Sequence, residues 1–84
     1  MRTIAILCRE IDKNTGNISA YPVCKDTAGG YDISYLRLRQ RYNPELSFWI
    51  ARTNTETIQT IIHQLHYETL NERMLQQRFR CVRI

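Results

Sequence analysis

The spacing of apolar residues changes near residue 53, and this change constrains the fold more than any other feature of the chain. Before it, the segments 3–12 and 18–24 alternate between apolar and polar residues, as half-buried strands do. After it, Ile58, Ile61, Ile62 and Leu65 recur at the spacing of a helix that lays one apolar stripe on a sheet. Strands followed by helices predict an α+β arrangement.

Length and composition limit the chain to one globular domain. Its 84 residues supply one hydrophobic core, and the 43% of hydrophobic residues with eight aromatics argue against intrinsic disorder. We therefore predict a single α+β domain over residues 1–84. A small antiparallel sheet of about four strands, in two hairpins, is expected to be packed by the C-terminal helix or helices. A core of this size rarely supplies more than about 3–5 kcal/mol, so homo-oligomerisation stays open.

The first hairpin is predicted from segments 3–12 and 18–24 with a turn between them. Gly16 suits the left-handed conformation that such a turn needs. Pro22 lacks a backbone N–H, which places the second strand at an edge or a bulge. With symmetric pairing, Cys8 and Cys24 approach each other as two small hydrophobic residues.

The segment 33–42 fits a strand. Leu36 and Leu38 would then face one way, and Tyr35 would face the other way together with three arginines. We favour this interpretation because the strongly strand-forming segment 46–52 needs a neighbour, and the two would form the second hairpin.

The same segment also fits a helix. Asp32 would then be the N-cap, and Asn43 would end the helix before Pro44. Composition and spacing leave this alternative open.

Two helix starts follow. The sequences beginning at Thr53 and Thr69 each have the Thr-x-x-Glu pattern of a capping box. The apolar stripe changes phase beyond Leu65, which predicts a break near Tyr67. Residues 79–84 alternate, and the pattern does not decide between a closing strand and a frayed end.

Arginine carries most of the positive charge and is the only feature that points to a function. The chain has ten arginines and two lysines, with a net charge of +4. Guanidinium groups are favoured where phosphate or carboxylate is bound through paired hydrogen bonds. On a strand, Arg37, Arg39 and Arg41 would project from one face about 7 Å apart, close to the spacing of successive phosphates. Tyr35 would lie on that face and could stack on bases.

The competing interpretation is a solvated strand face. Its arginines would pair with carboxylates of neighbouring elements. The candidates are Glu10, Asp12, Glu45 and Glu68.

Further candidates for a partner surface lie in the second half of the chain. Arg52, Arg78 and Arg80 would enlarge the basic surface if they share a face with the first arginines. Trp49 stands between Phe48 and Ile50, so one large side chain must face away from the other two. An exposed Trp49 would mark a protein-binding surface, whereas a helix over Phe48 and loops over Trp49 would bury both.

Catalysis is not predicted. His63 and His66 have a spacing that suits two ligands of one metal, but the sequence supplies no further ligands nearby, so ordinary histidines are expected. A small ribonuclease using these histidines is the only enzyme class worth testing. We expect no enzyme activity, no cofactor and no metal.

The surroundings of the protein are expected to be cytoplasmic and reducing. Three widely spaced cysteines form no C-x-x-C motif, and no segment resembles a signal peptide or a membrane span.

Two functions are therefore carried forward. The first is a non-enzymatic protein-binding module, an inhibitor or accessory factor from a phage or other mobile element, whose arginine face engages an acidic partner. The second is nonspecific binding of nucleic acid by the same face.

Overall fold

The computed structural model describes residues 3–24, 28–67 and 69–84, and it consists of one antiparallel sheet and three helices. The strand order is β2-β1-β3-β4. The predicted α+β class, with a four-stranded antiparallel sheet and C-terminal helices packed on it, is confirmed. The elements in chain order are β1 (Thr3–Ile11), β2 (Ile18–Pro22), α1 (Ile33–Tyr42), β3 (Ser47–Thr53), α2 (Thr55–His66), α3 (Glu72–Arg78) and β4 (Val82–Arg83).

The predicted first hairpin is confirmed. Its turn is stabilised by the Asp12 carboxylate, which accepts the backbone N–H of Asn14 at 2.8 Å, and by Gly16 at a φ of 74°. Pro22 lies in β2, an edge strand, as its missing N–H requires. Cys24 does not meet Cys8 as expected, because Tyr21 stands opposite Cys8 and Cys24 lies exposed beyond the strand.

The predicted strand at 33–42 is wrong, because this segment is the helix α1. Asp32 caps its start by accepting the backbone N–H of Tyr35 at 3.0 Å, and Asn43 is its C-cap, as the alternative interpretation required. β3 has other neighbours, since it pairs with β1 along seven residues and with β4 at two. The second hairpin therefore does not form, and the fourth strand is β4.

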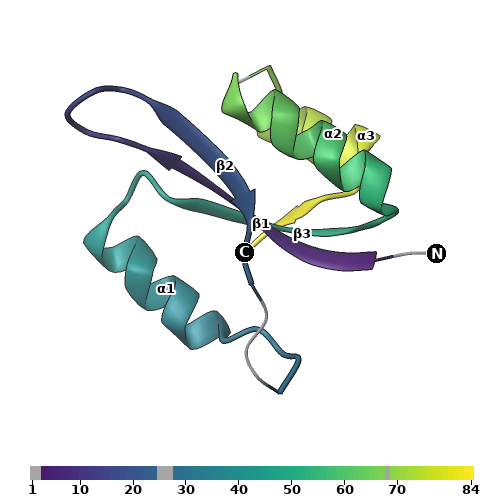
Figure 1. Cartoon of the computed structure of the whole chain (residues 1–84), viewed down its shortest axis with the longest axis horizontal. Coiled ribbons are helices and arrows are strands. Elements are labelled where there is room, and N and C mark those ends of the chain that lie inside the picture. Colours follow the sequence, from purple (N-terminus) through teal and green to yellow (C-terminus); the bar gives the residue numbers. More distant parts are fainter. Residues whose placement is uncertain (1–2, 25–27, 68) are drawn as a thin grey trace.

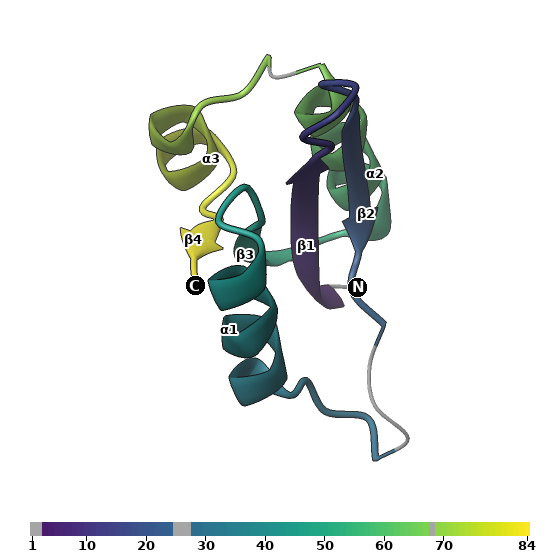
Figure 2. The same ribbon diagram turned by 90° about the vertical axis from the view of Figure 1, so that its left-hand side faces the viewer.

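The helices divide between the two faces of the sheet. Figures 1 and 2 show α1 on one side of the sheet, and α2 with α3 on the other. Each face therefore has a core of its own. The buried residues on the α1 side are Ile6, Cys8, Leu36, Leu46 and Phe48. Those on the opposite side are Ala5, Leu7, Ala20, Trp49, Ala51, Ile58, Ile61, Leu65, Leu70, Leu75 and Cys81.

The two C-terminal helices begin one and two residues later than the capping boxes predict. Asn54 caps α2 by accepting the N–H of Thr57 at 2.8 Å, and Asn71 caps α3 by accepting that of Met74 at 2.9 Å. The predicted break is confirmed, since α2 ends at His66. After α3, the chain pairs with β3 as the short strand β4, so the last residues form a closing strand.

Candidate functional site

The helix α1 separates the three arginines that a strand would align. At 3.6 residues per turn, Arg37 and Arg41 both lie about 200° around the helix from Arg39. Arg39 points to the sheet, where its guanidinium lies 2.7 Å from Glu10 Oε1 and 5.9 Å from the centre of the Phe48 ring. The predicted row of three arginines on one face is therefore wrong.

Arg39 belongs to a half-buried polar cluster that attaches α1 to the hairpin. The Tyr21 hydroxyl donates to Glu10 Oε1 at 2.5 Å, and Arg39 donates to both partners. Burial raises the pKa of Tyr21 above its ordinary value, and the hydrogen bond donated to Glu10 raises it further. The cluster orients α1 and fastens Arg39 to the hairpin through Nη2.

This cluster predicts a loss of stability in alkali. Because the pKa of Tyr21 is raised in the folded state, its contribution is complete below the unfolded value of about 10 and is lost as the pH rises further. Urea unfolding between about pH 9 and pH 11 should therefore show a falling free energy, with a shallower fall in Tyr21→Phe. Burial also raises the pKa of the Cys8 thiol, which adds to the trend in both proteins. Equal slopes for the two proteins would contradict the role of Tyr21.

The face of α1 that points away from the sheet carries large apolar side chains. The exposed fractions are 56% for Tyr35, 46% for Leu38 and 82% for Tyr42. These residues lie at positions i, i+3 and i+7, which is the spacing of one helical stripe. Leu38 and Tyr42 were missed at the sequence level because their alignment with Tyr35 exists only on a helix.

Arg37 and Arg41 flank this stripe. Together with Ser34 and Leu38 they line an open hollow of about 240 Å³. The ion pairs among the described residues join Arg39 to Glu10 and Arg83 to Glu72, and neither involves these two arginines. Asp12 and Glu45 form none of these pairs either, and Glu68 lies outside the described residues. The outer face of α1, consisting of Tyr35, Arg37, Leu38, Arg41 and Tyr42, thus combines apolar surface with free cations.

Trp49 does not belong to an exposed surface, so its assignment to a partner site is wrong. Trp49 packs in the core under α2 and α3, with the Arg9 guanidinium 5.4 Å from its ring centre. Phe48 packs on the opposite side, under α1. Both are buried because helices cover both faces of the sheet, which leaves no open face for either ring.

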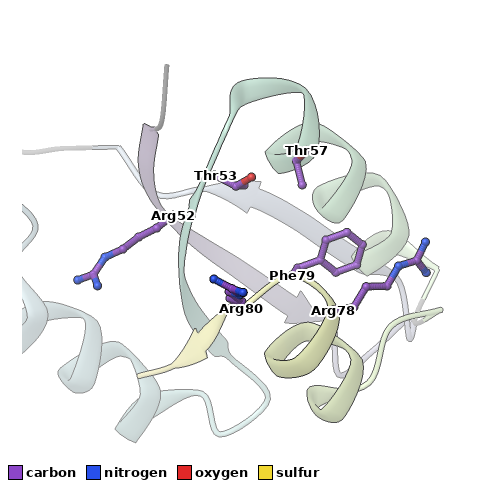
Figure 3. A pocket seen from close by; sticks show the side chains of 6 residues that line it. All are labelled: Arg52, Thr53, Thr57, Arg78, Phe79 and Arg80. Carbon is purple, nitrogen blue, oxygen red and sulfur yellow. The ribbon is translucent and has the colours of Figure 1, made fainter.

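Arg52, Arg78 and Arg80 border a second place, away from α1's outer face. They line a hollow of about 350 Å³ with Thr53, Thr57 and Phe79. In Figure 3, Arg52 leaves β3 toward α1, Arg80 stands between β3 and α3, and Arg78 extends toward α2. The Arg78 guanidinium lies 5.1 Å from the centre of the Phe79 ring. The expected enlargement of one arginine face is replaced by two separate basic places.

The two histidines have other neighbours. His63 packs its ring edge against Tyr67, with 5.2 Å between centres, and His66 Nδ1 lies 3.3 Å from the Ile18 carbonyl oxygen. Within residues 3–24, 28–67 and 69–84, no group of three or more His, Cys, Asp and Glu side chains could hold a metal ion.

No helix in the described part of the chain is both long and apolar enough to cross a membrane. Comparison of the chain with protein-family models, with curated proteins and with solved structures finds no match.

Proposed function

We propose that this chain is a non-enzymatic protein-binding module whose α1 outer face engages an acidic surface of a partner protein. The observation that carries the proposal is the exposure of Tyr35, Leu38 and Tyr42 beside two arginines that form no ion pair among the described residues. Such a module acts by covering its partner, as an inhibitor or accessory factor does.

The apolar stripe is unusual for a helix that already packs on a sheet. Leu36 supplies the buried contact, so folding does not require the opposite side of α1 to be apolar. Contiguous exposed apolar surface marks binding sites, and tyrosine and arginine are enriched among the residues that dominate binding energy. Tyr35 and Tyr42 present large rigid surfaces of this kind.

Charge selects the partner. Arg37 and Arg41 lie four residues apart on one face, and a protein surface with carboxylates would neutralise both. A second copy of this chain is disfavoured, because α1 against α1 would bring four like charges together.

The row of arginines that motivated nucleic-acid binding at this face is absent. A strand would have offered three guanidinium groups at the phosphate spacing, but the helix turns Arg39 to Glu10. The remaining pair is flanked by leucine and tyrosine side chains, which suits a protein surface better than a phosphate backbone.

A peptide-display selection tests the proposal. Random peptides are sorted for binding to the wild-type chain and then measured against Tyr35→Ala, Arg41→Glu and Arg52→Ala. We expect binders rich in Asp and Glu with an apolar anchor. Because Tyr35→Ala and Arg41→Glu each remove a binding hot spot, they should bind these peptides at least about 30-fold more weakly than the wild type. Arg52→Ala should bind them with unchanged affinity.

Two results would contradict the proposal. One is a set of binders without acidic enrichment, or with equal affinity for wild type and Arg41→Glu. The other is concentration-dependent dimerisation that Tyr35→Ala abolishes, which would assign the stripe to a second copy. Amide chemical shifts identify the surface used, and they should change along α1.

A further inference from the structure

Two hollows meet at Arg52 and Arg80, and their chemistry differs. The first is the polar hollow described above, with Thr53 and Thr57 in its wall. The second, of about 190 Å³, has Ile50 and Val82 beside the same two arginines. One ligand spanning both hollows would meet hydroxyl and guanidinium groups at one end and aliphatic side chains at the other.

The charge at this place is not neutralised by the described residues. The ion pairs among the described residues join Arg39 to Glu10 and Arg83 to Glu72, whereas Arg52, Arg78 and Arg80 take part in none. The nearest carboxylate in sequence is Glu56, which does not line either hollow. Arg52 and Arg80 border both hollows, and two such cations suit an anion with more than one negative charge.

The first turn of α2 adds to this preference. Thr57, in that turn, lines the polar hollow, and the positive end of the dipole of this twelve-residue helix lies there. The Thr57 N–H is already bonded to Asn54, so the turn contributes its dipole and a threonine hydroxyl, while the arginines supply the main attraction.

The backbone holds Arg80 in an unfavourable conformation. Its φ of 54° lies in the left-handed region, which a residue with a Cβ rarely adopts. The next residue, buried Cys81, donates its N–H to the Leu75 carbonyl at 2.8 Å, which fastens the turn to the end of α3. Glycine would suit this backbone better, so the arginine side chain is not there for the turn's sake.

We infer that this double hollow binds a nucleotide, with the phosphate between Arg52 and Arg80, which border both hollows, and the base over Ile50 and Val82. A phosphate monoester carries close to two negative charges and accepts several hydrogen bonds, which matches two guanidinium groups at the border of a hollow with threonine hydroxyls in its wall. The base is flat and apolar on its faces, and guanidinium groups stack on such rings. An acidic peptide fits less well than a nucleotide. Each of its carboxylates carries one charge instead of nearly two, and only a single side chain would fill the aliphatic hollow.

Titrations followed by amide chemical shifts test the inference. The probes are adenosine 5′-monophosphate, inorganic phosphate, adenosine, a short single-stranded oligothymidylate and an oligoglutamate peptide. We expect the monophosphate to bind at least about tenfold more tightly than inorganic phosphate or adenosine, because each supplies only half of the contacts. Shift changes are expected at Arg52, Thr53 and Arg80.

Matched variants separate this site from the α1 outer face. Arg80→Gly should melt at or above the wild-type temperature, since glycine relieves the left-handed strain, yet it should bind the monophosphate at least about tenfold more weakly. Arg52→Ala should weaken binding similarly. The double variant Arg37→Ala, Arg41→Ala removes two charges elsewhere, one more than either single variant, and should bind normally.

The outcomes decide both the ligand and the site. Binding of the monophosphate assigns a free nucleotide, and binding of oligothymidylate alone assigns the phosphate of a nucleic-acid strand. Equal affinity for inorganic phosphate and the monophosphate would overturn the inference, as would equal affinity for oligoglutamate. Wild-type affinity in Arg80→Gly and Arg52→Ala, or no binding by any probe, would also overturn it.

Discussion

Leu36→Ala is expected to lower the free energy of unfolding by about 2–5 kcal/mol, whereas Leu38→Ala should change it by less than about 0.5 kcal/mol. The two leucines are two residues apart in α1, and their exposed fractions are 2% and 46%. Removing the buried side chain leaves a cavity against Ile6 and Phe48, and removing the other leaves open surface. Leucine and alanine have similar helix propensities, so the comparison reports burial.

Urea unfolding followed by circular dichroism measures both values. The pair is its own control, because the same atoms are removed from the same helix. A strand at 33–42 would place both leucines on one face, so equal losses in the two variants would contradict the helix.

Phe48→Ala and Trp49→Ala are each expected to cost about 3–5 kcal/mol, which is close to the whole stability of a domain of this size. These neighbours in β3 face opposite sides of the sheet, and each ring is buried in a different core. Both variants should therefore be largely unfolded at about 37 °C.

Milder replacements keep this prediction measurable. Phe48→Leu and Trp49→Phe should each lower the melting temperature. The two decreases are expected to differ, because each replacement changes the packing of a different core. Tyr42→Ala, at an exposed position, serves as the control and should melt like the wild type. If either Phe48→Ala or Trp49→Ala lost less than about 1 kcal/mol, one face of the sheet would have to be open.

The elements best predicted from sequence are those defined by their own local chemistry. The first hairpin has a turn with Asp12 and Gly16, and both residues act within five positions of each other. In the predicted stripe of α2, Ile58, Ile61 and Leu65 are buried, and Ile62 is half-buried against the same core. For such segments neighbouring residues alone select the structure.

The candidate sites were predicted less well, because each depends on side chains that are distant in sequence. Arg37 and Arg41 remain at a binding surface, but Arg39 is removed from it by contact with Glu10, 29 residues away. Trp49 is removed because α2 and α3 cover its face of the sheet. Arg52 and Arg80 come together at one double hollow through the return of the chain along β3.

The sequence by itself therefore determined the hairpin, the amphipathic α2, the break after it and the excess of arginine. Only the tertiary structure decided that residues 33–42 are a helix and which of its arginines are free. Leu36 is buried whether the segment is a strand or a helix, so local pattern cannot separate the two. Its contact with Ile6 and Phe48, and the ion pair of Arg39 with Glu10, exist only for the helix, and these long-range contacts select it.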